Sequence, residues 1–272
     1  MKKLTVAALQ LSTLGMHDNR LDFYFKNAQK RGASIVVIGE YVLNHFFREL
    51  EHMPPMMVEE QTAKHLLLLQ NMSRTYDIVV VAPFVILKNK KFYKTIAKIT
   101  PKKTTYQDQQ ILLPYEHWNE QDFFANKITK LKQPMIFTHN GFKIMVLSGY
   151  ELHFSYFWDI VREKQVDLVI LPTASTFESH NRWREIIKTQ AFLNGCYVLR
   201  ANRIGEYGDK DMKWRFYGDT MLVAPSGEVE MMLEDKESML VEDIYKDEVK
   251  IHRKIWQFEK AIKIRKTKEL SQ

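Results

Sequence analysis

The sequence predicts one α/β domain, in which helices cover the faces of a β-sheet. Three observations support this class. Strand-like and helix-like segments alternate from the first residues onward. Several strand-like segments, such as Ala33–Ile38, are continuous apolar runs, which is typical of strands buried on both faces. Of the 272 residues, 45% are hydrophobic and 27% are charged, a composition that supports a sizeable core and excludes disorder.

The elements follow from hydrophobic periodicity and from turn residues. The expected strands are Lys3–Gln10, Ala33–Ile38, Ile78–Val85, Lys91–Ile99, Thr104–Tyr106, Gly141–Leu147, Leu168–Leu171, Tyr197–Ala201, Thr220–Ala224 and Val229–Leu233. The expected helices are Asn19–Arg31, Val58–Thr75, Ser155–Lys164 and Asn181–Leu193. No Gly/Ser-rich or Pro-rich linker divides the chain, so we expect residues 1–272 to form a single domain.

Composition also restricts the class of protein. No stretch approaches the roughly 18 apolar residues that a membrane-spanning helix needs. The apolar run Leu4–Leu9 is broken at Gln10, which favours a first strand over a signal peptide. The one cysteine, Cys196, excludes an internal disulfide framework and a cysteine-rich zinc module. We therefore expect a cytoplasmic protein that needs no metal and no cofactor.

The positive charge is concentrated near the C-terminus. Between Lys250 and Lys268 there are eight basic residues and one acidic residue, Glu259, which accounts for the formal net charge of +7. Apolar residues in this stretch, Ile251, Ile255, Phe258 and Ile262, follow helical spacing. The pattern predicts a basic helix over about 244–268 that packs one face and solvates the other. A nucleic-acid or anionic membrane-surface patch is a less favoured alternative, because charge runs are usually solvated faces.

Three positions could carry chemistry. Glu40 directly follows a buried strand, where α/β proteins build their sites, and desolvation there would suit it to general-base work. A solvated loop carboxylate is an equally good interpretation from the sequence alone. Glu116, beside His117 and Trp118, is a candidate second carboxylate, whereas His117 is expected to be structural. The apolar strand before Gly149 runs into a sharp turn of the nucleophile-elbow kind, but glycine offers no side chain there.

These segments together resemble the carbon–nitrogen hydrolase (nitrilase) superfamily. The similarity is carried, in chain order, by Val6–Gln10, Val37–Glu40, Gln109–Glu116, Val146–Glu151, Asn194–Gly205 and Tyr217–Val229. The third segment is similar to the family's Lys-x-His-Leu-x-Pro motif with a following glutamate, and the fourth to a segment that ordinarily ends in Cys-Tyr-Glu. The resemblance implies a four-layer α-β-β-α sandwich. It also implies a homodimer formed through the helices after Gly149 and around Asn181–Leu193.

Members of this family hydrolyse amides or nitriles with a cysteine nucleophile, a glutamate base and a lysine that stabilises negative charge. Carried over by position, the base is Glu40 and the auxiliary glutamate is Glu116. The lysine position holds Gln109 and the cysteine position holds Gly149. The resemblance also implies ligand contacts for Trp118 and Tyr150.

The missing nucleophile decides the functional hypothesis. A thioester cannot form at Gly149, and the neighbouring Ser148 is expected to point to the opposite face. Cys196 lies in an apolar strand and is expected to be an inert thiol. We therefore expect a catalytically impaired family member that binds a small amide or amine, or acts as an interaction module. Two alternatives remain open: an amidase that uses another nucleophile or a water activated by Glu40, and a nucleic-acid or membrane-surface binder that uses the C-terminal helix.

Overall fold

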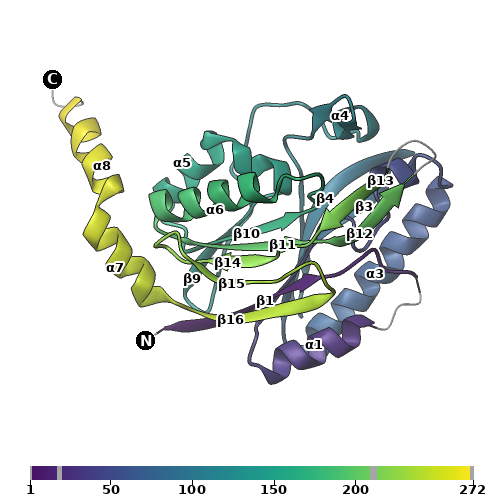
Figure 1. Cartoon of the computed structure of the whole chain (residues 1–272), viewed down its shortest axis with the longest axis horizontal. Coiled ribbons are helices and arrows are strands. Elements are labelled where there is room, and N and C mark those ends of the chain that lie inside the picture. Colours follow the sequence, from purple (N-terminus) through teal and green to yellow (C-terminus); the bar gives the residue numbers. More distant parts are fainter. Residues whose placement is uncertain (1, 17–19, 209–212, 270–272) are drawn as a thin grey trace.

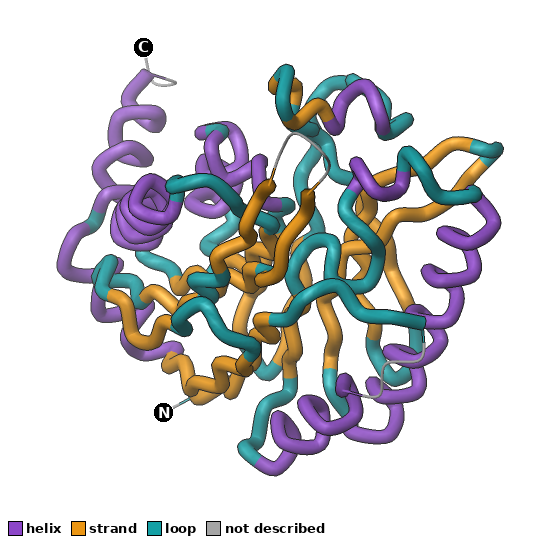
Figure 2. The backbone as a smooth tube through the Cα atoms, turned by 45° about the vertical axis from the view of Figure 1, so that its right-hand side comes forward, coloured by secondary structure: helices purple, strands orange, loops and turns teal. Residues whose placement is uncertain are grey.

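The computed structural model describes residues 2–16, 20–208 and 213–269, with side chains up to residue 265. Two six-stranded sheets lie face to face, and helices cover the outer face of each (Figures 1 and 2). This arrangement confirms the expected four-layer sandwich.

The first sheet has the strand order β16-β1-β2-β3-β4-β5. Its strands are β1 (Lys3–Gln10), β2 (Ile35–Ile38), β3 (Val79–Lys88), β4 (Lys91–Ile99), β5 (Thr104–Asp108) and β16 (Ser238–Tyr245). Strands β1, β2 and β3 are parallel, whereas β3, β4 and β5 form antiparallel pairs. The carboxyl end of β2 and the middle of β4 position the site described below.

The second sheet has the order β15-β14-β11-β10-β9-β8. Its strands are β8 (Ile136–His139), β9 (Phe142–Val146), β10 (Leu168–Thr173), β11 (Tyr197–Asn202), β14 (Met221–Val223) and β15 (Val229–Met232). Strands β9, β10 and β11 are parallel, so their carboxyl ends share one edge of the sheet.

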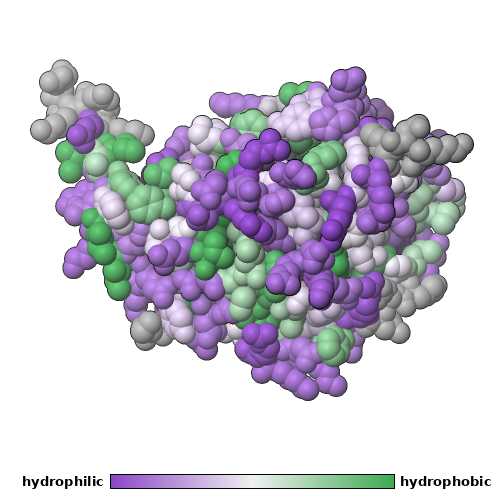
Figure 3. Space-filling model, viewed as in Figure 1, coloured by the Kyte–Doolittle hydropathy of each residue, from purple (hydrophilic) through white to green (hydrophobic). Residues whose placement is uncertain are grey.

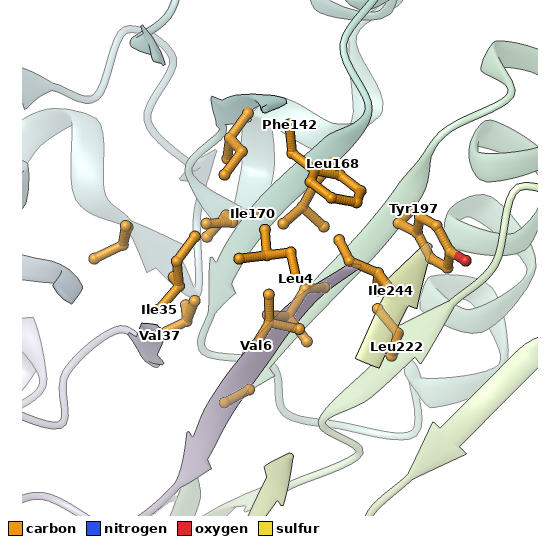
Figure 4. Packing of buried hydrophobic residues seen from close by; sticks show 14 of the residues in the cluster. Leu4, Val6, Ile35, Val37, Phe142, Leu168, Ile170, Tyr197, Leu222 and Ile244 are labelled. Atoms are coloured by element: carbon orange, nitrogen blue, oxygen red, sulfur yellow. The ribbon is translucent and has the colours of Figure 1, made fainter. Parts of the chain in front are cut away.

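The main core lies between the two sheets. In β1, Leu4, Val6 and Ala8 face this core, while Ala7 and Leu9 face the helices outside. Side chains from both sheets interdigitate there, among them Ile35 and Ile170 (Figure 4). Because every second residue of a strand points to the same face, a strand buried on both faces must be apolar throughout. This geometry explains the continuous apolar runs in the sequence.

Two helix layers complete the sandwich. Helices α1 (Arg20–Lys30) and α3 (Pro55–Tyr76) pack on the first sheet through residues such as Phe25 and Leu69. Helices α5 (Ser155–Glu163) and α6 (His180–Asn194) pack on the second sheet through residues such as Trp158 and Ile187. Each was expected within a few residues of its observed bounds, except that the expected first residue of α1, Asn19, lies outside the described residues.

Several short elements were not expected. They are α2 (Phe47–Leu50), β6 (Pro114–Tyr115), β7 (Trp118–Asn119), α4 (Glu120–Phe123), the 3₁₀ helix η1 (Gly149–His153), β12 (Ile204–Gly208) and β13 (Lys213–Tyr217). Strands β8 and β16 were also missed. In β16 the acidic pair Glu242 and Asp243 interrupts the apolar pattern, and Asp243 is accommodated at the sheet edge by hydrogen bonds from Thr5 and Lys3.

The expected C-terminal helix is wrong in two respects. It consists of two helices, α7 (Lys246–Trp256) and α8 (Phe258–Glu269), because Gln257 between them adopts a left-handed conformation with φ of 50°. Most of the expected apolar stripe is exposed, namely Ile251, Ile255 and Ile262, although Phe258 contacts Phe192. Helix α7 packs on the sandwich through the buried Val249 and His252, whereas α8 projects from it (Figures 1 and 3). Within the described ranges, no helix has both the length and the apolarity to cross a bilayer.

Candidate active site

Glu40 lies where the edges of the two sheets meet. It follows β2 by two residues, and its backbone N–H donates to the carbonyl of Thr173 at the end of β10, at 3.1 Å. Its side chain is only 6% exposed, so it is a buried carboxylate and not a solvated loop residue. The next residue, Tyr41, has φ of 56°, a strained conformation for a bulky residue.

A lysine contacts this carboxylate, and it comes from β4. The Nζ atom of Lys94 lies 3.3 Å from Oε2 of Glu40 and 2.7 Å from Oε1 of Glu120, and it lies 4.8 Å from the centre of the Tyr41 ring. Lys94 is 4% exposed. The resemblance assigned the lysine position to Gln109, but the site does contain an ammonium group, which Lys94 supplies.

Gln109 and Lys94 are cross-strand neighbours. The antiparallel register pairs Thr95 with Asp108, and the N–H of Gln109 donates to the carbonyl of Lys94 at 3.0 Å. Residues directly opposite each other in an antiparallel pair have side chains on the same face, about 5 Å apart. The ammonium group of Lys94 can therefore lie close to the position that the ammonium group of a lysine at 109 would occupy. The Gln109 amide instead donates to the carbonyl of Ile111 at 2.7 Å and does not line the pocket.

The second carboxylate is Glu120 and not Glu116. Glu120 begins α4, is fully buried, and accepts hydrogen bonds from Lys94 and from the hydroxyl of Tyr41. Glu116 is exposed in the turn between β6 and β7 and does not line the pocket. The turn of the β6–β7 hairpin places Glu116 in solvent. The spacing of residues in the sequence motif could not predict this hairpin.

Gly149 faces Glu40, as the family motif implies. Its N–H donates to Oε1 of Glu40 at 3.3 Å, and a Cβ atom built on it would lie 3.4 Å from both carboxylate oxygens. The turn that presents it is fixed by the buried Glu151, which accepts hydrogen bonds from the backbone N–H groups of Ser148 and Gln110. Ser148 is buried and does not line the pocket, as expected.

The site is a buried cluster of opposite charges. Burial raises the pKa of Glu40, Lys94 opposes this effect, and Glu120 adds to it. Burial alone would lower the pKa of Lys94, but the two carboxylates outweigh it and raise the pKa. Burial and both glutamates also raise the pKa of Tyr41 well above its usual value, so its hydroxyl stays a hydrogen-bond donor.

Glu40 and Lys94 line a cavity of about 460 Å³, a size that suits a small organic ligand. Trp118 and Tyr150, both expected to contact a ligand, line it, and so does His117, which was expected to be structural. The complete lining is Glu40, Lys94, Leu113, Tyr115, His117, Trp118, Gly149, Tyr150, His153, Ala174, Ser175, Thr176, Phe177, Ser179, Arg182, Trp183 and Ile186.

Cys196 is remote from this chemistry. It is fully buried in the core between the second sheet and its helices, and burial raises the pKa of its thiol to about 12. It therefore has the properties of a structural cysteine.

Sequence reasoning missed Lys94, Glu120 and Phe177. Lys94 did leave a signal, because it is a charged residue in the interior of the predicted strand Lys91–Ile99. Phe177 gave none: it has φ of 56° and a ring that is 46% exposed at the pocket.

The sequence profile of the carbon–nitrogen hydrolase family matches residues 5–253. The chain belongs to this family. The buried Glu40, the Lys94 ammonium beside it and the turn at Gly149 are thus found in a member of this family.

Individual relatives are distant. An N-carbamoylputrescine amidase of Solanum tuberosum is 22% identical, over 93% of this chain and 90% of its own length. The carbon–nitrogen hydrolase of Helicobacter pylori G27 has a similar fold, with a TM-score of 0.84 at 17% identity over 99% of both chains. An amidase from Nesterenkonia sp. gives a TM-score of 0.75 at 18% identity, over 91% of this chain and 92% of its own.

Proposed function

We propose that this protein binds a small amide- or amine-bearing ligand in the Glu40 pocket and does not cleave it through an acyl-enzyme. The observation that carries the proposal is the pairing of an intact buried Glu40–Lys94–Glu120 cluster with Gly149. The cluster supplies a carboxylate that accepts N–H donors. It also supplies an ammonium with three donors, of which two are directed at the glutamates. An amide offers the complementary pair, an N–H donor and a carbonyl acceptor.

Nucleophilic catalysis needs a group that position 149 does not have. Removing the nucleophile from a catalytic triad lowers kcat on the order of a million-fold in a well-studied protease. The pocket groups can still bind and orient an amide. The similarity to N-carbamoylputrescine amidases supports a ligand with an amide-like terminal group, because a carbamoyl group presents the same donors and acceptor.

The test combines binding with turnover. Pentanamide binding is measured by calorimetry, and ammonia release is followed over hours with the full-length protein. We expect saturable binding without ammonia release, and loss of binding in Glu40→Gln. Ammonia release that Glu40→Gln abolishes would overturn the proposal and favour hydrolysis by an activated water.

Restoring the nucleophile tests whether the pocket is still that of an amidase. The variant Gly149→Cys is compared with Gly149→Ala, which adds the same Cβ without sulfur. Because Lys94 already supplies an ammonium, we expect Gly149→Cys alone to release ammonia, without a lysine at position 109. Ammonia release only after Gln109→Lys is added would show that Lys94 does not act as that group.

We also propose that the chain forms a homodimer through α5 and α6. Exposed apolar side chains on these helices, Tyr156 and Leu193, support this surface. Light scattering during gel filtration at micromolar concentration should give twice the chain mass of 32.3 kDa. A monomer at that concentration would contradict the proposal.

A further inference from the structure

The two ends of the Glu40 pocket differ in charge. The buried end holds Glu40 and Lys94, which neutralise each other in part. At the exposed end the lining includes Arg182, which is the third residue of α6. Among the described residues that line the pocket, Glu40 is the only carboxylate, so no acidic side chain of the lining offsets Arg182.

Arg182 differs from the other arginines close to it. Arg184 is held by two hydrogen bonds from Nε to the carboxylate of Asp219, at 2.9 and 3.0 Å, and the buried Arg200 contacts the same carboxylate at 3.2 Å. The guanidinium of Arg182 makes no hydrogen bond and no ion pair with any residue that the structure describes. Its planar group of N–H donors matches a carboxylate in a bidentate arrangement.

Six rings of the pocket lining form a continuous series, which we call the aromatic rim. They are Phe177, His117, Tyr115, Tyr150, His153 and Trp183, and each ring centre lies between 5.1 and 5.8 Å from the next. All six line the pocket. Such a rim provides apolar faces for a methylene chain that joins two polar ends.

The rim is built rigidly on one side. Two residues precede the left-handed backbone of Phe177: Ser175, whose N–H donates to Oδ1 of Asn202, and Thr176, whose hydroxyl donates to the carbonyl of Arg215. A third hydrogen bond joins Ser179 to the carbonyl of Thr176. These contacts hold the strained residue in place at the pocket.

We propose that the ligand is an amide whose far end is a carboxylate, with the amide at Glu40 and Lys94 and the carboxylate at Arg182. This inference rests on the proposed function and adds the substrate class. It differs from what the similarity to N-carbamoylputrescine amidases would suggest, because an amine at the far end would meet a guanidinium of the same charge.

Three ligands of one length test the inference. Glutaramate, pentanamide and 5-aminopentanamide share a five-carbon amide and differ only in the far end, which is anionic, neutral or cationic. Binding to the full-length protein is measured by calorimetry. We expect glutaramate to bind at least about ten-fold more tightly than pentanamide, and 5-aminopentanamide to bind most weakly.

Matched variants separate this inference from the proposed function. Arg182→Gln should lower the affinity for glutaramate to within about two-fold of that for pentanamide. Lys188→Gln removes a charge on the same helix outside the pocket and should change neither affinity. If all three ligands bind with equal affinity and Glu40→Gln abolishes their binding, the inference is wrong but the proposed function still holds. No binding of any of them would overturn both.

Discussion

Lys94 and Glu40 form a buried ion pair, 3.3 Å from Nζ to Oε2, which joins β4 to the segment after β2 although β3 separates these two strands in the first sheet. Lys94 also contacts Glu120 at 2.7 Å, so one ammonium lies between two carboxylates that are almost fully buried. Removing the cation would leave the two carboxylates close together in a low-dielectric environment.

Replacing Lys94 should therefore destabilise the fold. In Lys94→Met we expect the free energy of unfolding to fall by about 3–5 kcal/mol, since an uncompensated buried charge remains. Urea denaturation at pH 7 measures the loss. The control Lys91→Met removes an exposed lysine from the same strand and should change the free energy by less than about 0.5 kcal/mol. A loss below 1 kcal/mol in Lys94→Met would contradict the buried-pair interpretation.

A cysteine at position 149 should be tolerated and reactive. The added Cβ would lie 3.4 Å from its nearest neighbours, which is ordinary contact, and the position opens into the pocket. Mass spectrometry after iodoacetamide treatment of native Gly149→Cys should show one modification. The parent protein should show none, because Cys196 is fully buried and the pKa of its thiol is raised to about 12. Modification of the native parent protein would contradict this assignment of Cys196.

Glu151 should make stability depend on pH. Burial raises the pKa of this carboxyl from 4.5 to about 7, although backbone N–H donors oppose the shift. The folded chain then binds more protons than the unfolded chain between those values, so its stability falls as the pH rises from 4.5 to 7. Relative to Glu151→Gln, which cannot ionise, the parent protein should lose up to about 3 kcal/mol of unfolding free energy between pH 4 and pH 8.

Urea denaturation of both proteins at the two pH values checks this difference. The exposed Glu185→Gln serves as the control, and its difference from the parent should not depend on pH. A constant difference between the parent and Glu151→Gln would show that the folded and unfolded carboxyls have the same pKa.

The strained backbone at Phe177 predicts a difference between two small replacements. Glycine accepts φ of 56° without the Cβ clash that alanine retains. Phe177→Gly should therefore be more stable than Phe177→Ala by about 1 kcal/mol in thermal or urea unfolding, despite the greater flexibility of glycine in the unfolded chain. The reverse order would indicate that the loop relaxes once the phenyl ring is removed.

The sequence pattern predicted the α/β class, and the family resemblance predicted the four layers and two positions of the site. Glu40 and Gly149 each follow an apolar strand closely, but only the resemblance indicated that they belong to one site. Lys94 and Glu120 could not be placed in this way. The position of Lys94 in the site depends on the register between β4 and β5. Glu120, and not Glu116, reaches the site because the β6–β7 hairpin places Glu116 outside it. Neither strand pairing can be predicted from the spacing of residues in a motif.

Of the five tryptophans in the chain, Trp118 and Trp183 line the pocket. Trp118 also stacks on Trp214, with ring centres 5.7 Å apart. A molecule that enters the pocket must come close to these indoles and change their emission. The protein thus contains its own optical reporter of occupancy, and compound collections can be screened by intrinsic fluorescence without any label.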